Sequence, residues 1–359
     1  MTEEKDIVGL SVPFAAGAGV GALLLLAVHS PFSLSCATVI ALAISVFLTL
    51  RSPGGSVPGL VASLALCGML CSLSQAASAP FVRAGALTEV AREAAGWLRN
   101  TIDCIPYAED GSAPLVKALL TGDRSSLSRD ITGVFRAAGA SHILALSGLH
   151  LGLVYLILLR LSSFLGNSIT ARRARCALIV LSCGFYALAT GGSPSIIRAF
   201  LFVSLNESAK LLGRERKALR VYCSALFIQL VISPSAITSI GFWLSYLAMA
   251  GIVLVYPHLR AWYPPSSHWD ITRRIWDGAA LSISCQLFTA PLVYFVFGTF
   301  PKYFLLTNLL AMPLTSAVMT VSIATVTLSA LGICPTPLVV IDEKILNALV
   351  ETLRIISEM

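Results

Sequence analysis

Long apolar segments recur along this chain, and short turn-like or charged links separate them. A helix needs about 20 apolar residues to cross the hydrocarbon core of a bilayer, and a run of about 10–14 is typical of a re-entrant or half-membrane piece. Three segments come before residue 80, at 12–28, 32–50 and 57–73, and seven follow residue 141, at 143–159, 176–189, 196–205, 219–232, 237–256, 279–297 and 304–331. The pattern predicts an all-α polytopic membrane protein with about ten transmembrane or half-membrane helices.

The composition favours a bilayer over water as the surroundings of the fold. Of the 359 residues, 56% are hydrophobic and 12% are charged, whereas a soluble domain has about 45–50% apolar and about 25% charged residues. The nine cysteines are scattered, mostly within apolar runs, and none has the spacing of a zinc site. Gly17 and Gly21 have GxxxG spacing in the first apolar run, which favours the close approach of a second helix.

Two parts of the chain have an amphipathic pattern. Residues 80–141 are rich in charge, and the sequence predicts an amphipathic helix over 84–103 and a second short helix over 127–138. The apolar positions that recur at helical spacing in the first of these are Leu87, Val90, Ala94, Trp97 and Leu98. The tail 338–356 has a polar side formed by Asp342, Glu343, Lys344, Glu351 and Arg354. We expect such helices at a membrane surface, although the tail also suits a last weak span.

The distribution of Lys and Arg in short loops predicts the orientation in the membrane. Basic clusters lie at 160–175, 210–220 and 260–274, and the alternating loop ends are nearly free of such charge. These clusters therefore face the cytoplasm, which places the N-terminus in the cytoplasm and 80–141 on the outer side. The arginines of that outer segment favour an anionic ligand. The predicted parts are N-terminal transmembrane helices at 1–79, an outer-side amphipathic helical region at 80–141, a transmembrane core at 142–335 and a C-terminal amphipathic helix at 336–359.

Polar side chains at the start of the 143–159 run are the first candidates for a functional site. The sequence SHILALSGLHLGLVYLILL places His142, Ser147 and His150 there. Ser147 and His150 share one face of a helix because they are three residues apart. Polar groups at membrane depth are costly and usually face a cavity or a partner. An equal alternative is that Ser147 bonds a backbone carbonyl one turn back and the histidines lie at the interface.

Three later candidates each lie near a helix-breaking residue. Arg198 interrupts a short apolar run directly after GGSPS, which is typical of a discontinuous helix that lines a polar space, unless the side chain snorkels to the interface. Gln286 precedes Pro291 and Asn308 precedes Pro313, so each amide is near backbone groups that local unwinding would free. The amides also suit purely structural hydrogen bonds between helices.

Several motifs are absent from the sequence. It has no Walker A loop, HExxH, EF-hand loop or Rossmann glycine pattern, so we expect no cofactor, no metal and no ATP-driven motor. No carboxylate lies in the middle of an apolar run. An intramembrane hydrolase using Ser147 and His150 is an alternative, but nucleophile and base would lie on facing helices, and here both lie on one turn. We therefore expect a protein without enzymatic activity.

The stretch at 122–153, GDRSSLSRDITGVFRAAGASHILALSGLHLGL, closely resembles the core of the ComEC family of bacterial competence proteins. GGSPSIIRAF, GFWLSYLAMAGI, CQLFTAPLVYFVFGTFP and NLLAMPL follow in the order of the family, so the resemblance covers roughly residues 115–314. It implies a channel in the bacterial inner membrane that translocates single-stranded DNA into the cytoplasm during natural transformation. The residues expected along the DNA pathway are Arg124, Arg136, His142, Ser147, His150, Arg198, Gln286 and Asn308.

The resemblance implies single-stranded DNA and membrane lipid as partners. A full-length member also has an OB-like domain and a metallo-β-lactamase-like domain. Here the outer region is too short for an OB barrel beside its helices, and no HxHxDH-type motif is present. We therefore expect separate OB-like and nuclease subunits, together with a cytoplasmic helicase or other competence proteins. A transporter of another anionic solute, or a degenerate member of the family, is the alternative.

Overall fold

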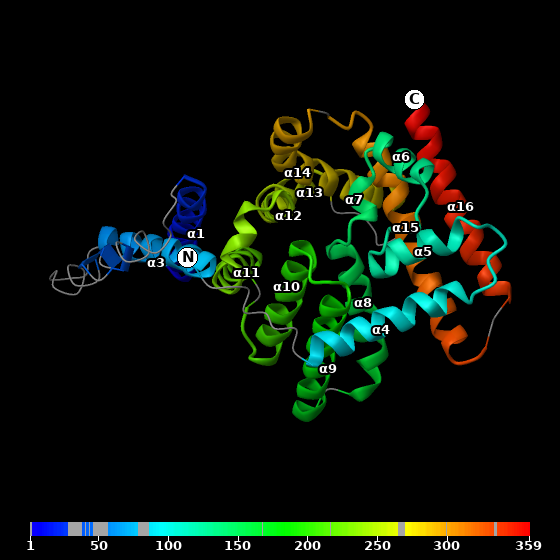
Figure 1. Cartoon of the computed structure of the whole chain (residues 1–359), viewed down its shortest axis with the longest axis horizontal. Coiled ribbons are helices and arrows are strands. Elements are labelled where there is room, and N and C mark those ends of the chain that lie inside the picture. Colours follow the sequence, from blue (N-terminus) through cyan, green and yellow to red (C-terminus); the bar gives the residue numbers. More distant parts are fainter. Residues whose placement is uncertain are drawn as a thin grey trace. The chain divides into compact units, whose positions relative to one another are not determined.

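The structure of the chain is a computed structural model (Figure 1). It describes residues 2–27, 38, 39, 41, 42, 44, 45, 57–77, 86–166, 168–215, 217–264, 270–298, 300–333 and 336–359. Every regular element within these ranges is a helix, which confirms the predicted all-α class. The helix predicted at 32–50 lies largely outside the described residues.

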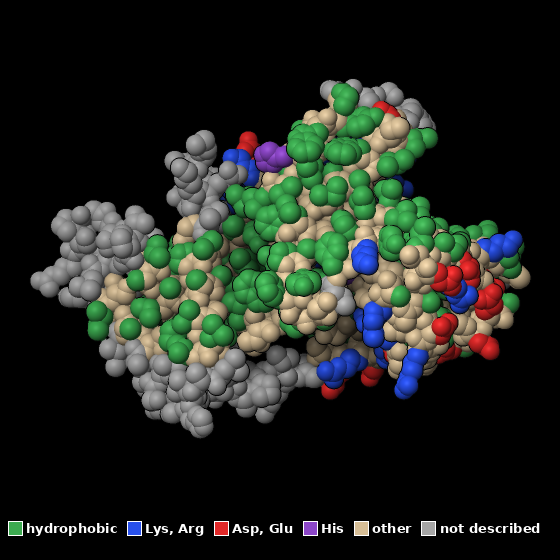
Figure 2. Space-filling model, turned by 90° about the horizontal axis from the view of Figure 1, so that it is seen from above, with side chains coloured by type: hydrophobic (Ala, Val, Ile, Leu, Met, Phe, Trp, Pro, Cys, Tyr) green, Lys and Arg blue, Asp and Glu red, His purple; other side chains and the backbone are tan. Residues whose placement is uncertain are grey.

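Apolar helices dominate the described part of the chain. Four of them are long and apolar enough to cross a membrane, namely Gly148–Leu165, Ile240–Ala261, Ile271–Phe297 and Phe304–Ala330. Shorter apolar helices cover Gly9–Leu24, Val61–Leu73, Ser112–Thr121 and Ala218–Ile232. Hydrophobic side chains cover much of the face shown in Figure 2, whereas Lys, Arg, Asp and Glu gather in one part of it. Apolar surface of this extent marks a membrane or interaction surface, and the protein is a membrane protein.

The chain divides into two compact units, and the first consists of residues 1–85 and 201–249. Its complete helices are α1 (Thr2–Ala27), α3 (Val57–Ala77), α11 (Ala218–Ile232) and η2 (Pro234–Thr238). Most of α10 (Pro194–Leu211) and α12 (Ile240–Leu254) also belongs to it. A buried polar contact lies in this unit, because the Tyr246 hydroxyl donates to Gln229 Oε1 over 2.8 Å. This contact fastens α12 to α11.

Glycines bring α1 and α3 into close backbone contact. A Cβ atom on Gly17 would lie 1.7 Å from the carbonyl oxygen of Ala65, and one on Gly21 would lie 2.8 Å from that of Met69. A larger residue at either position would therefore force the two helices apart. The structure confirms the close approach that the GxxxG spacing predicts.

The second unit consists of residues 86–200 and 250–359. Its first helices are α4 (Ala86–Asp103), α5 (Ser112–Thr121), α6 (Arg129–Ala137), α7 (Ser141–Leu144), α8 (Gly148–Leu161), η1 (Ser162–Leu165) and α9 (Ile169–Ala189). The start of α10 and the end of α12 follow. Its last helices are α13 (Tyr256–Ala261), α14 (Ile271–Phe297), α15 (Phe304–Ala330) and α16 (Thr336–Glu358). Thus α15 and α16 belong to the same unit as the charged segment that begins at α4.

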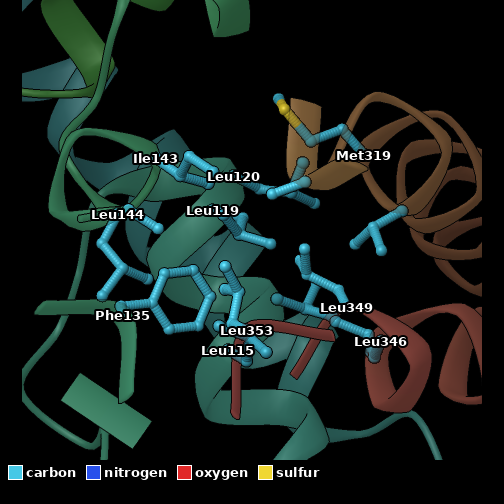
Figure 3. Close-up of a cluster of buried hydrophobic side chains, with 14 of the residues drawn as sticks. Leu115, Leu119, Leu120, Phe135, Ile143, Leu144, Met319, Leu346, Leu349 and Leu353 are labelled. Atoms are coloured by element: carbon cyan, nitrogen blue, oxygen red, sulfur yellow. The ribbon is translucent and has the colours of Figure 1, made fainter. Parts of the chain in front are cut away.

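A hydrophobic core joins that charged segment to the last two helices (Figure 3). Its side chains come from α4, α5, α6, α7, α15, α16 and the loops between the first four, and include Leu115, Leu119, Phe135, Ile143, Leu144, Met319, Leu346, Leu349 and Leu353. The apolar stripe of α16 therefore packs against protein. Burial of these side chains, at about 25 cal/mol per Å² of apolar surface, is the main force that holds α16 in place.

Asp342 differs from the prediction that placed it on the polar side of the tail. It is 0% exposed, and its carboxylate accepts hydrogen bonds from the Tyr107 hydroxyl and the Ser322 hydroxyl, each over 2.8 Å. Burial raises the pKa of Asp342, and the two hydroxyl donors oppose that effect in part. The carboxylate thus links α16 to α15 and to the loop after α4.

The helix α4 has two apolar stripes. Ala91, Ala95 and Ile102 are buried within the unit, whereas Leu87 and Trp97 are 72% and 57% exposed. The stripe that the sequence predicted as the apolar face is therefore largely uncovered by the described chain. Exposed Trp and Leu side chains on one amphipathic helix suit a membrane interface.

Candidate functional site

The first turn of α8 is built by Ser147 and His150. Ser147 has an extended backbone and precedes the helix, and its Oγ accepts the Leu149 N–H over 3.2 Å. The ring of His150 turns back, so that its Nδ1 accepts the Ser147 N–H over 3.2 Å and lies 3.1 Å from Ser147 Oγ. This reciprocal arrangement is a capping box, and it fixes where the spanning helix begins.

The capping box determines which nitrogen of His150 carries the proton. Since Nδ1 accepts a backbone N–H, the neutral ring has its proton on Nε2. That Nε2 atom is buried and has no hydrogen-bond partner within the described chain, and His150 is 0% exposed. A buried donor without an acceptor costs free energy. The His150 Nε2–H at the start of α8 therefore lacks a hydrogen-bond acceptor among the described residues.

Arg198 brings a cation to the same turn. It lies one turn into α10 and is 7% exposed. A Cβ atom on Gly148 would lie 3.9 Å from Arg198 Nη2 and 3.6 Å from Ala199 Cβ. The start of α10 therefore lies directly against the start of α8, and the absence of a side chain at Gly148 leaves room between the helix end and the guanidinium.

Arg124 approaches the turn from the end of α5. Gly122 ends that helix with φ +78°, and a Cβ there would lie 2.2 Å from Leu146 Cδ1, so only glycine fits. Asp123 then accepts the Ser125 N–H over 3.0 Å and its hydroxyl over 2.7 Å, which fixes the turn. Arg124 is exposed, and its charge is close enough to act on the His150 ring. The packing of Gly122 on Leu146 thus holds Arg124 beside the capping box.

The carboxylate of this turn, Asp123, lies near the cation Arg99. The hydrogen bonds from Ser125 hold the pKa of Asp123 below its ordinary value, and Arg99 and Lys117 act in the same direction. Arg99 Nε lies 3.6 Å from Asp123 Oδ2. Asp123 is therefore ionised, and its nearest cation is Arg99.

A second pair of candidates meets beside α7. The His142 ring interacts with the Asn308 side chain and with the Gly139 backbone. Thr307, the residue before Asn308, donates its hydroxyl to the Ala138 carbonyl over 2.8 Å and so ties α15 to this turn. The Oδ1 atom of Asn308 is buried and has no hydrogen bond to the described residues.

The structure brings six of the eight predicted residues together in two groups, and it leaves the other two, Arg136 and Gln286, outside both. Arg124, Ser147, His150 and Arg198 meet at the start of α8, and His142 meets Asn308. Arg136 is exposed on α6, and Gln286 is on α14 with a buried Nε2 that has no hydrogen bond in the described chain. No described hydrogen bond or ion pair joins Arg136 or Gln286 to either group.

The geometry of Ser147 and His150 indicates that they cap the helix and do not form a nucleophile and base pair. A serine nucleophile needs a base whose nitrogen is free to take its proton. Here His150 Nδ1 already accepts a backbone N–H, and Ser147 Oγ already accepts another. The described residues also contain no cluster of three His, Cys, Asp or Glu side chains able to hold a metal ion. What the turn can do chemically is present donors and positive charge.

Sequence reasoning missed the residues that shape the site without touching a ligand. Gly122 and Gly139 have positive φ, and a Cβ on Gly139 would lie 2.7 Å from Pro301 Cβ. Tyr186 donates its hydroxyl to the Leu120 carbonyl over 3.0 Å, which holds the end of α5 against α9. A glycine directly after a short apolar helix is the signal that would have found Gly122.

These features define a class of protein: a helical membrane core in which the start of a spanning helix carries positive charge and hydrogen-bond donors. The chain belongs to the competence protein family, which it matches over residues 119–359. It is 25% identical over 202 residues to ComE operon protein 3 of Bacillus subtilis (strain 168), a match that covers 56% of this chain and 24% of the relative. It is also 26% identical over 216 residues to competence protein ComA of Neisseria gonorrhoeae, covering 57% of this chain and 29% of that protein.

A further relative is the uncharacterized protein YcaI of Escherichia coli (strain K12), 26% identical over 207 residues, which cover 56% of this chain and 27% of that protein. The chain thus matches between 24% and 29% of the length of these three relatives. No solved structure matches the chain significantly.

Proposed function

We propose that this protein is an inner-membrane channel that translocates single-stranded DNA into the cytoplasm during natural transformation. Membership of the competence protein family and the helices that are long enough to span a membrane support this function. The observation that bears most directly on it is the meeting of Arg124, Arg198 and the buried His150 donor at the start of α8. A polymer with one negative charge per nucleotide requires such groups along its path.

The exposure of the site residues suggests how a strand would reach them. Arg124 is exposed, Ser147 and Gly148 are partly exposed, and Arg198 and His150 are buried. Exposed cations attract the strand over a distance, and buried ones interact more strongly because water screens them less. In this proposal the segment 80–141 faces the outside, the N-terminus is cytoplasmic, and separate subunits supply DNA capture, strand degradation and pulling.

Removal of the pathway arginines tests the proposal. We expect Arg124, Arg136 and Arg198, all replaced by Gln, to lower uptake of labelled DNA by at least about tenfold in a deletion strain, because each lost phosphate contact weakens the hold on the strand. The measurement is internalised label per cell, with membrane abundance determined by immunoblot.

A matched variant replaces the exposed Lys302, Lys344 and Arg354, which lie outside the basic clusters that predict the orientation, so the same charge is lost elsewhere. We expect near-normal uptake from it. Normal uptake by the pathway variant at normal abundance would rule out the proposed function. A growth defect in the deletion strain with unchanged transformation would favour transport of another anionic solute.

A further inference from the structure

We propose that the first turn of α8 is a phosphate-binding site, formed by the Gly148 N–H, the His150 Nε2–H and the Arg198 guanidinium, with Arg124 at its rim. The choice of a DNA phosphodiester as the natural ligand rests on the proposed function. The site itself rests on the geometry of the turn alone.

The backbone at the start of α8 provides the first donor. Of the leading N–H groups, that of Leu149 is accepted by Ser147 Oγ and that of His150 by the Ser147 carbonyl. The Gly148 N–H remains at the open end of the helix. The positive end of the helix dipole also lies here, which favours an anion at this point.

His150 provides a second donor that needs an acceptor. Its Nδ1 is used by the capping box, so Nε2–H is fixed as a donor, and the ring is fully buried at the helix start. An oxygen of a phosphate supplies the missing acceptor. This buried side-chain donor adds to the backbone donor of the same turn, and it requires the same kind of ligand.

Positive charge accumulates at the same point. Arg198 Nη2 lies beside the Gly148 position, and the charge of Arg124 acts on His150. An anion at this point would be attracted by both guanidinium groups and by the positive end of the helix dipole. A guanidinium fork also matches the two unesterified oxygens of a phosphodiester.

Replacing Gly148 by alanine should block the site without changing the fold. A Cβ at this position would meet Ala199 Cβ at 3.6 Å and Arg198 Nη2 at 3.9 Å, which are ordinary contact distances. A methyl group therefore fits, but it fills the space between the helix end and the guanidinium. Gly152, one turn later, has nothing within 4 Å of an added Cβ, so Gly152→Ala is the matched control.

The experiment uses the full chain in nanodiscs of phosphatidylcholine, which has no net charge to compete for the site. Binding of a fluorescent twelve-nucleotide dT strand is measured by anisotropy. We expect Gly148→Ala and Arg198→Gln to weaken binding by at least about tenfold, the loss expected for hydrogen bonds to a charged group. Arg198→Lys should weaken it less, and Gly152→Ala should bind like wild type. Inorganic phosphate should compete with the strand.

The results separate the site from the proposed function. Equal binding of the strand by wild type, Gly148→Ala and Arg198→Gln would overturn the phosphate site and leave DNA transport standing. If no strand binds, inorganic phosphate is tested alone at constant ionic strength. A rise in unfolding temperature for wild type and Gly152→Ala, but not for Gly148→Ala, would then support the site and count against DNA as its ligand. An equal response of wild type, Gly152→Ala and Gly148→Ala to phosphate would overturn the site.

Discussion

Asp342 is a single buried residue that affects both the packing of α16 and the pH dependence of stability. Its carboxylate is buried without a cation among its described contacts, and two hydroxyl groups stabilise it. Burial raises the pKa, so the folded chain holds the proton more tightly than the unfolded chain does. The contribution of this group to the free energy of unfolding is therefore larger at low pH and falls as the pH rises through the raised pKa.

We expect Asp342→Asn to unfold at a higher temperature than wild type at pH 7.5, because the amide keeps the size of the side chain without its charge. The difference between the two proteins should shrink as the pH falls, because the raised pKa lets the folded wild type take up a proton on this carboxyl before the unfolded chain does. Thermal unfolding in nanodiscs from pH 7.5 to 4 measures it.

Asp110→Asn, at an exposed position, is the control for a general loss of negative charge. It should follow the wild-type pH dependence. A constant difference between wild type and Asp342→Asn at every pH would contradict a raised pKa for this carboxyl.

At the scale of helices, the contact of α1 with α3 depends on backbone shape. Gly17→Ala would place a methyl group 1.7 Å from the Ala65 carbonyl oxygen, so the two helices must separate. Overpacking of this kind costs about 1–3 kcal/mol. We expect a lower unfolding temperature and less protein in the membrane for this variant.

Gly9→Ala on the same helix is the comparison, because an added Cβ there meets nothing within 4 Å. It should match wild type or exceed it slightly, since alanine favours helix. Equal stability of Gly17→Ala and wild type would show that the close contact contributes nothing.

The helices themselves could largely be predicted from sequence because hydrophobicity and helical spacing are local properties. The amphipathic helix predicted at 84–103 corresponds to α4, and the short helix predicted at 127–138 corresponds to α6. The pairing of Ser147 with His150 follows from their spacing of three on one turn. Partners distant in sequence could not be predicted in this way. Neither the burial of Asp342 nor the place of Arg198 beside Gly148 leaves a local pattern.

At the scale of the whole molecule, the orientation in the membrane can be tested by chemical labelling of a single residue. Cys104 follows α4 and is exposed. If the segment from α4 to α7 faces the outside, a membrane-impermeant maleimide should label this thiol in cells whose inner membrane is intact. Labelling is read by gel shift of the purified chain.

Cys104→Ser identifies the signal, since the chain contains other cysteines. Loss of label in this variant would assign it to Cys104. Labelling of Cys104 only after the inner membrane is permeabilised would reverse the predicted orientation and move the phosphate site to the cytoplasmic side.

The core of the second unit also has a consequence for the order in which the protein is made. Leu115, Phe135 and Leu144 pack against α15 and α16, which the ribosome synthesises last. The segment from α4 to α7 is therefore synthesised before its packing partners exist. Contacts between such distant parts of a chain form slowly, and unpaired apolar surface is prone to misassembly. Until the last two helices are made, the apolar side chains of this segment lack the partners that bury them in the finished fold.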